Sequence, residues 1–124
     1  MKTVLIVEDN EKNMKLARDV LQAKGYATLE AINGEAGVRL ALAHRPDLVL
    51  MDIQLPDING VEAFTRIRAH PDMAGVPVAA FTASVTPGDR SRINDAGFDA
   101  FIGKPINLKE FLATVKRLTE GGRG

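Results

Sequence analysis

Five side chains in this sequence carry chemistry that becomes useful only if the fold brings them together. They are three carboxylates, a hydroxyl and an ammonium: Glu8, Asp9, Asp52, Thr82 and Lys104. Asp52 closes a strongly apolar run, where a charge is costly unless a partner compensates it. A carboxylate nucleophile beside a metal ion, an ammonium and a hydroxyl is equipped to receive a phosphoryl group.

Short apolar runs alternate with helical patterns along the chain and predict the elements that carry these side chains. Three near-continuous apolar runs, residues 4–7, 48–51 and 76–81, are typical of central parallel strands with helices on both faces. Weaker runs at 27–32 and 100–102 predict edge strands. Repeated strand–helix units with right-handed crossovers predict an α/β fold, an open parallel sheet of five strands between helices.

The last two predicted helices differ in how firmly they should be anchored. Asn107 is the expected N-cap of the final helix, and Glu110 stands where a capping box needs it. That helix carries one apolar stripe, made of Leu108, Phe111, Leu112, Val115 and Leu118. Thr86 and Pro87 predict the start of the preceding helix. Since that helix has little apolar surface, we expect it to dock loosely.

The five candidate side chains should meet at one rim of this sheet. Ligands of open parallel sheets bind outside the carboxyl ends of the strands, where the strand order reverses. Three neighbouring carboxylates cannot all stay ionised unless a cation is present or a pKa rises. Oxygen ligands without histidine or cysteine favour a hard cation, Mg²⁺ first, which uses one or two carboxylates and keeps water molecules.

Each candidate residue taken singly has an ordinary structural explanation. Glu8 and Asp9 could stabilise the start of a helix through its dipole, and Asp52 could cap a turn. Thr82 is a common strand residue, and Lys104 could be an exposed loop lysine. Their convergence on one rim favours a functional site over these separate explanations.

Composition limits the class of protein. The chain has 124 residues, 45% hydrophobic and 26% charged, as expected of one globular domain. Basic and acidic residues both number 16, so no net charge favours nucleic-acid binding. The absence of cysteine excludes disulfides and thiolate metal sites. Without a signal-peptide core or a run of transmembrane length, we expect a cytoplasmic protein that does not insert into membranes.

The sequence resembles the receiver domain of two-component response regulators over essentially its whole length. The segments that carry the resemblance are the acidic pair Glu8-Asp9, "MDIQLPDING" around Asp52, "FTAS" with Thr82, and "GKP" with Lys104. The opening "LIVEDNEKNMKL" and the expected lack of an output domain resemble the single-domain regulators of the cell-division type. The resemblance implies a flavodoxin-like fold with strand order 2-1-3-4-5, a receiver domain over residues 1–120 and a frayed tail over 121–124.

The resemblance also implies a role for each residue of the site. Asp52 would accept a phosphoryl group from a phosphohistidine on a histidine kinase or phosphotransfer protein. Asp9, Asp52 and the backbone carbonyl of Gln54 would bind Mg²⁺, with Glu8 acting through a water molecule. Lys104 would bridge Asp52 at rest and bind a phosphoryl oxygen after transfer. Glu8 stands where many family members have aspartate, which lengthens the side chain but keeps the charge.

A conformational switch follows from the same resemblance. Thr82 would bind another phosphoryl oxygen and draw its loop inward, and Phe101 would turn into the space that Thr82 vacates. Because Phe101 lacks a hydroxyl, switching would depend on packing. The peptide bond before Pro105 would be cis. Gln54 and Ser84 would influence how long the phosphate survives.

The function implied is that of a signalling phosphoacceptor rather than an enzyme. It would bind a downstream protein, or pass the phosphoryl group on in a phosphorelay. The face for the downstream protein would combine the helix that starts at Pro87, the strand 100–102 and the final helix. The first helix would dock the kinase.

Three other functions are conceivable for a chain with these residues. A dehalogenase-type phosphatase needs a second aspartate two residues after the nucleophile, where Gln54 stands. A nucleotide or flavin carrier needs a phosphate cradle after the first strand, where Glu8-Asp9-Asn10 repels phosphate. A constitutive interaction module with the receiver fold, acting without phosphorylation, stays open as the alternative.

Overall fold

Five short strands pair in parallel into one sheet in the computed structural model, which describes residues 1–83 and 87–121. The strand order is β2-β1-β3-β4-β5, which confirms the predicted fold and order. The strands are β1 (Thr3–Val7), β2 (Ala27–Ala31), β3 (Leu48–Asp52), β4 (Val78–Thr82) and β5 (Ala100–Gly103).

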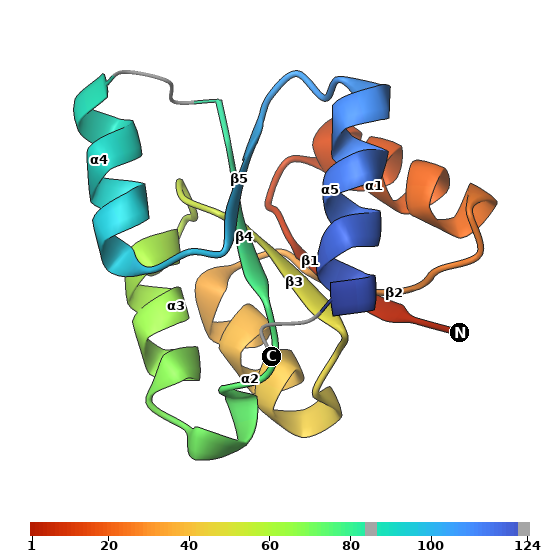
Figure 1. Cartoon of the computed structure of the whole chain (residues 1–124). Coiled ribbons are helices and arrows are strands. Elements are labelled where there is room, and N and C mark those ends of the chain that lie inside the picture. The colour runs from red at the N-terminus through yellow and green to blue at the C-terminus, as the bar shows by residue number, and fades with distance from the viewer. Residues whose placement is uncertain (84–86, 122–124) are drawn as a thin grey trace.

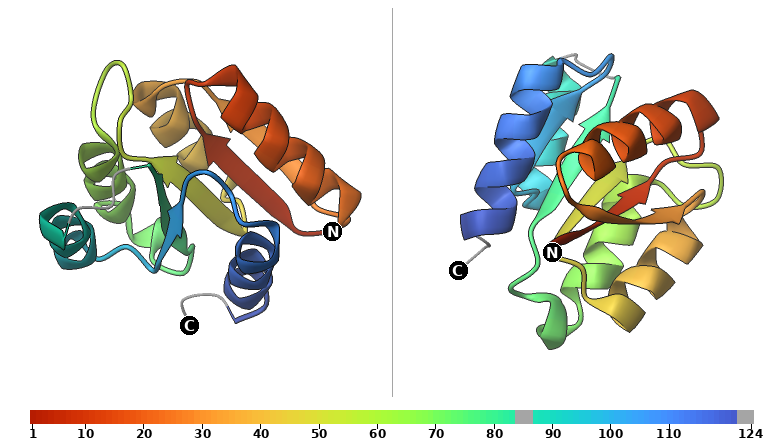
Figure 2. Two further views of the ribbon diagram at one scale, coloured as in Figure 1. Left: turned by 90° about the horizontal axis from the view of Figure 1, so that it is seen from above. Right: turned by 90° about the vertical axis from the view of Figure 1, so that its right-hand side faces the viewer.

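Helices cover both faces of the sheet. They are α1 (Glu11–Ala23), α2 (Gly34–His44), α3 (Gly60–Arg68), α4 (Pro87–Ala96) and α5 (Leu108–Gly121), with a short 3₁₀ turn, η1 (Pro71–Met73). Figures 1 and 2 show α1 and α5 on one face and α2, α3 and α4 on the other. In the described part of the chain, no helix is long and apolar enough to span a membrane.

Two apolar layers hold the helices against the sheet. Every residue of β3 and β4 is buried, as their continuous apolar runs predict. Leu21 of α1 and Phe111 of α5 pack in the layer on one face. Phe64 and Ile67 of α3 pack in the layer on the other face. The strands therefore form a rigid platform whose carboxyl ends carry the polar residues.

The start of β4 differs from the sequence prediction, which began that strand at Val76. The structure starts it at Val78. The Val76 N–H instead donates to the carbonyl of Met73, 3.0 Å away, and so closes a turn. Pro77 lies between Val76 and Val78 and has no N–H for a strand ladder. The hydrophobic pattern alone could not separate this buried turn from the strand.

The final helix begins as predicted, but one residue of its stripe does not face the core. The side chain of Asn107 accepts from the N–H of Glu110 at 3.1 Å. Leu108 is 52% exposed, because it lies at the first helical position and points into solvent. The helix continues to Gly121, which was predicted as part of a frayed tail. The start of α4 at Pro87 is as predicted, and its expected cap, Thr86, lies outside the described residues.

Two side-chain contacts tie distant elements together. The hydroxyl of Tyr26, just after α1, lies 3.4 Å from the hydroxyl of Thr119 on α5. Thr119 is buried and donates to the carbonyl of Val115 at 2.8 Å. This pair joins the segment between α1 and β2 to helix α5.

A second contact set lies at the amino ends of β4 and β5. Arg68 at the end of α3 donates to the carbonyls of Met73 at 2.8 Å and Val76 at 2.7 Å, and to the carboxylate of Asp99 at 3.0 Å. The same Asp99 oxygen accepts from the N–H of Val78 at 2.8 Å. One guanidinium thereby fixes the turn that leads into β4.

Candidate functional site

The register of the sheet brings the predicted residues to one edge. Val7 of β1 pairs with Met51 of β3, so the next residues, Glu8 and Asp52, are neighbours across the two strands. Thr82 is the last residue of β4 and pairs with Gly103, directly before Lys104. The carboxyl ends of four strands therefore supply the site, as the topology rule for open parallel sheets requires.

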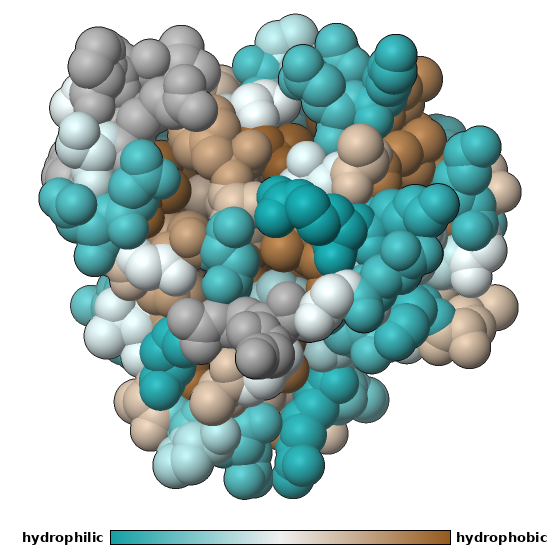
Figure 3. Space-filling view, viewed as in Figure 1, coloured by the Kyte–Doolittle hydropathy of each residue, from teal (hydrophilic) through white to brown (hydrophobic). Residues whose placement is uncertain are grey.

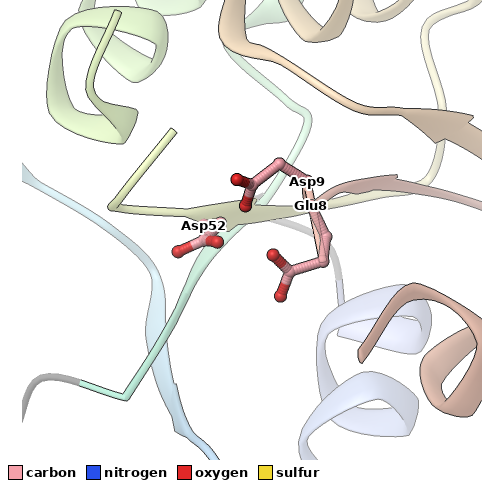
Figure 4. Close-up of side chains that lie close together, drawn as sticks. All are labelled: Glu8, Asp9 and Asp52. Carbon is pink, nitrogen blue, oxygen red and sulfur yellow. The ribbon is translucent and has the colours of Figure 1, made fainter. Parts of the chain in front are cut away.

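Three carboxylates converge at the ends of β1 and β3. Glu8, Asp9 and Asp52 each offer an oxygen atom within 4.8 Å of the others. Figure 4 shows the three side chains directed toward a shared space. Glu8 is 1% exposed and Asp52 is 4% exposed, whereas Asp9 lies on the surface. Two of the three charges are therefore withdrawn from water and need compensation.

Lys104 supplies that compensation. Its ammonium lies 3.1 Å from a carboxylate oxygen of Asp52 and also forms an ion pair with Glu8. It lies over the aromatic ring of Phe81, 4.7 Å from the centroid, which favours a cation electrostatically. Its backbone N–H donates to the carbonyl of Thr82 at 3.0 Å, and its peptide bond to Pro105 is cis. Lys104 is thus held by both its backbone and its side chain.

The electrostatics of this cluster bear most heavily on Glu8. Burial is the largest cause that raises the pKa of Glu8 above its ordinary value. The hydrogen bond and the negative charge of Asp52 act in the same direction, while Lys104 opposes them. Two buried carboxylates therefore share one ammonium, and a further positive charge would stabilise the cluster with both carboxylates ionised.

The loop after β3 is fitted closely around Asp52. The N–H of Gln54 donates to the second carboxylate oxygen of Asp52 at 3.0 Å. A Cβ at Gly60 would overlap the backbone carbonyl of Asp52, so the loop can return this closely only with glycine there. The N–H of Gly60 also donates to the carbonyl of Ile53 at 2.9 Å. These contacts orient the Asp52 side chain toward the shared space.

The predicted switch residues, Thr82 and Phe101, lie on the adjacent strands β4 and β5. Thr82 is buried, at 1% exposure. Phe101 is half-buried and lines a groove of about 410 Å³ along β5 and α5, together with Pro105 and Phe111. Figure 3 shows apolar surface between α4 and α5, where this groove lies. Ser84, predicted to affect phosphate lifetime, is outside the described residues.

The donor set suits a hard divalent cation. All three converging groups are carboxylates, which Mg²⁺ prefers to nitrogen or sulfur ligands. Among the described residues, Lys104 is the ammonium that contacts two of them, Glu8 and Asp52, so the three carboxylates leave an excess of negative charge in a largely buried place. The residues present therefore fit a magnesium ion, and the exposed Asp9 leaves the cluster open to solvent on that side.

The structure also shows contributors that sequence reasoning missed. These are the ring of Phe81 under Lys104, the direct ion pair between Glu8 and Lys104, and the close approach at Gly60. The glycine in "DING" was a visible signal of a tight approach. Nothing in the local pattern marks Phe81 as more than a core residue.

Fold and site together define the receiver class of signalling domains. Residues 4–116 match the model of the response regulator receiver domain, and the chain belongs to that family. Among curated relatives, the polar-differentiation response regulator DivK of Brucella anthropi is 47% identical over 115 residues. That alignment covers 93% of this chain and 94% of the relative. DivK of Brucella ovis is 45% identical with the same coverage.

Solved structures of receiver domains superpose closely on this chain. The receiver domain of a sensor histidine kinase from Pseudomonas aeruginosa, which has magnesium coordinated in its active-site cleft, has a TM-score of 0.89 at 33% identity. The match covers 96% of this chain and 98% of that one. The receiver domain of a histidine kinase from Syntrophus aciditrophicus has a TM-score of 0.90 at 32% identity, with 98% and 92% covered.

Proposed function

We propose that this chain is a single-domain response regulator that accepts a phosphoryl group on Asp52 in a magnesium-dependent reaction. The observation that carries the proposal is the shared ammonium of Lys104, which joins buried Asp52 and Glu8 beside the open carboxylate of Asp9. Because this ammonium pairs with the carboxylate proposed to accept the phosphoryl group, it lies close to where a phosphoryl oxygen would be after transfer. The alignments cover 94% of the DivK relatives and 93% of this chain, which supports a domain organisation like theirs.

Four groups hold the metal in this proposal. Asp9, Asp52 and the backbone carbonyl of Gln54 bind Mg²⁺ directly, and Glu8 acts through a water molecule. When bound, the metal neutralises negative charge on the phosphoryl oxygens. The magnesium found in the P. aeruginosa receiver domain supports this assignment.

The transfer itself exchanges one bond to phosphorus for another. A carboxylate oxygen of Asp52 forms a bond to the phosphorus of a phosphohistidine, and the phosphorus–nitrogen bond breaks, leaving the imidazole on the donor protein. Lys104 moves from pairing with the carboxylate to holding a phosphoryl oxygen. The hydroxyl of Thr82 donates to another phosphoryl oxygen. Fixed donors at positions where charge gathers are the efficient way to stabilise such a step.

In this proposal, phosphorylation of Asp52 changes the conformation of the face formed by α4, β5 and α5. Movement of Thr82 toward the phosphoryl group lets Phe101 turn inward, which changes the groove beside β5 and α5. Gln54 and Ser84 tune the lifetime of the phosphate. The downstream protein recognises the altered face, or a phosphotransfer protein takes the phosphoryl group onward.

The relatives and the composition support a proposal for the cellular setting. We infer that a histidine kinase or a histidine phosphotransfer protein supplies the phosphoryl group in the cytoplasm. The receiver domain extends over residues 1–120. The naming of the Brucella relatives as polar-differentiation regulators supports a role of the cell-division type. Neither a nucleic acid nor a membrane is a partner in this proposal.

Intact-mass measurement after incubation with acetyl phosphate tests the proposal. Wild type should gain one phosphoryl group with Mg²⁺ and none with a chelator. Asp52→Ala should gain none, while Asp72→Ala, which alters an exposed acid paired with Arg45, should behave as wild type. Wild type that stays unmodified, also with a phosphorylated histidine phosphotransfer protein, would leave the constitutive interaction module as the better explanation.

A further inference from the structure

The loop between β3 and α3 is attached to a helix that contributes no residue to the acidic cluster. The carboxylate of Asp57, in the middle of this loop, accepts from the backbone N–H of Gly34 at 2.7 Å and of Glu35 at 2.8 Å. Both amides belong to the first turn of α2. One side chain thereby bonds the loop to an element far from it in sequence.

In the described part of the chain, Asp57 is the acceptor given for the first two amides of α2. The first four N–H groups of a helix have no partner within the helix. The side chain of Asn33 accepts from Ala36 at 2.8 Å, and its carbonyl accepts from Gly37 at 3.0 Å. Asn33 therefore serves the third and fourth amides of α2, and Asp57 serves the first and second.

The next loop residue makes the attachment a close one. A Cβ at Gly34 would overlap the side chain of Ile58, so the loop lies directly against the start of α2. Ile58 also packs on the apolar layer beneath the sheet. The pair of hydrogen bonds and this packing fix both the position and the direction of residues 57–58.

The remainder of the loop is pinned at the site. Gln54 donates to the carboxylate of Asp52, and Gly60 donates to the carbonyl of Ile53. Gln54 is thus held to Asp52 by its own N–H, and the loop three residues further on is held to α2 by Asp57. Although burial opposes ionisation, the amides of Glu35 and Gly34 lower the pKa of Asp57, in keeping with a carboxylate that works as an anion here.

We propose that Asp57 is a positioning residue for the metal site: its bonds to the first turn of α2 hold the loop so that the carbonyl of Gln54 faces the acidic cluster. This inference rests on the proposed function, in which that carbonyl is a magnesium ligand. The geometry assigns the helix dipole and two amides of α2 a part in metal binding without contact to the metal.

The test measures magnesium binding in the unphosphorylated protein. Backbone amide shifts of nitrogen-labelled protein are followed as magnesium chloride is added to wild type, Asp57→Ala, Asp57→Asn and Asn33→Ala. We expect roughly tenfold weaker binding for Asp57→Ala, the scale of lost outer-shell support. Asp57→Asn, which keeps one acceptor oxygen, should lie between. Asn33→Ala removes the other cap of α2 without touching the loop and should match wild type.

Two further measurements separate positioning from general loosening. Hydrogen exchange of the Gly34 and Glu35 amides should quicken in Asp57→Ala without metal. The initial rate of phosphorylation by acetyl phosphate should reach the wild-type value at saturating Mg²⁺, with only the half-saturating concentration raised. A lowered maximal rate with unchanged half-saturation would overturn the inference.

The outcomes also separate this inference from the proposed function. If wild type binds magnesium and is phosphorylated, and Asp57→Ala binds magnesium equally well, the inference fails alone. It fails as well if Asn33→Ala weakens binding as much as Asp57→Ala does. Wild type that neither binds magnesium nor accepts a phosphoryl group would defeat the proposed function and this inference with it.

Discussion

The ammonium of Lys104 lies 3.1 Å from a carboxylate oxygen of Asp52 while it also pairs with Glu8. One cation therefore pairs with two buried anions, and its single charge cannot neutralise both carboxylates. A phosphoryl group or a metal that enters the site must change this three-way arrangement. The chemistry of the site and the stability of the fold are linked through these residues.

Removing the shared cation should destabilise the protein when metal is absent. Lys104→Met keeps most of the side-chain bulk and leaves Glu8 and Asp52 without their ammonium. We expect the free energy of unfolding to fall by about 3 kcal/mol, the scale for breaking a buried ion pair from one side. Urea denaturation in a chelating buffer measures it, and added Mg²⁺ should restore part of the loss. Lys116→Met, on the exposed side of α5, is the control. Equal stability of Lys104→Met and wild type would mean that the carboxylates need no cation.

The raised pKa of Glu8 predicts how stability depends on pH. In the folded protein Glu8 keeps its proton at pH values above its ordinary pKa of 4.5, whereas in the unfolded chain it loses the proton near that value. The stabilising contribution is therefore complete below that value and is lost as pH rises through the folded pKa. Glu8→Gln lacks this loss, so its stability relative to wild type should grow with pH, by at most about 1.4 kcal/mol per unit.

Denaturation of wild type and Glu8→Gln at a series of pH values, in chelator, measures this difference. Excess Mg²⁺ should flatten it, because a nearby cation favours the ionised carboxylate. Parallel stability curves in chelator would contradict a raised pKa for Glu8.

The close approach at Gly60 predicts a substitution that the loop cannot absorb. Gly60→Ala would force its Cβ against the backbone carbonyl of Asp52. We expect a loss of about 2–3 kcal/mol in stability, together with slower phosphorylation, because the strain falls on the acceptor residue itself. Gly88→Ala is the matched control, since nothing lies within 4 Å of its Cβ. It should be neutral or stabilising by up to about 1 kcal/mol. Thermal unfolding and the acetyl phosphate assay report the two effects.

The guanidinium of Arg68 predicts a loss of stability without a loss of site chemistry. Arg68→Met removes donors from the carbonyls of Met73 and Val76 and from Asp99, at the strand ends opposite the acidic cluster. We expect the free energy of unfolding to fall by about 3 kcal/mol while magnesium affinity stays at the wild-type value. Arg66→Met, which removes only exposed ion pairs, should cost much less. A parallel drop in magnesium affinity would show that the two ends of the sheet are coupled.

Much of the fold was predictable because it follows from local patterns. The continuous apolar runs of β3 and β4 favour strands buried on both faces, and the strand–helix alternation then favours a parallel sheet. The polar residues at the strand ends follow from topology, and the structure brings Glu8, Asp52 and Lys104 into contact. Their roles in phosphoryl transfer stay predictions until the experiments above are done.

The missed features depend on contacts between elements that no local pattern encodes. Phe81 reads as a core residue, and only the pairing of β4 with β5 places its ring beneath Lys104. Asp57 reads as a turn residue, and only the packing of α2 beside the loop gives it two amides to cap. Leu108 fits the helical stripe by spacing, yet the first helical position lies beyond the edge of the core.

The contact between Tyr26 and Thr119 gives this protein a built-in optical reporter. The chain has one tyrosine and no tryptophan, so its intrinsic ultraviolet fluorescence comes chiefly from a single ring. The hydroxyl of that ring lies 3.4 Å from α5, on the side of the helix that faces α1. A shift of α5 against its neighbour would alter the emission directly, with no attached dye. If phosphorylation displaces the last helix, as the proposed function expects, the displacement can therefore be followed in real time on the unmodified chain.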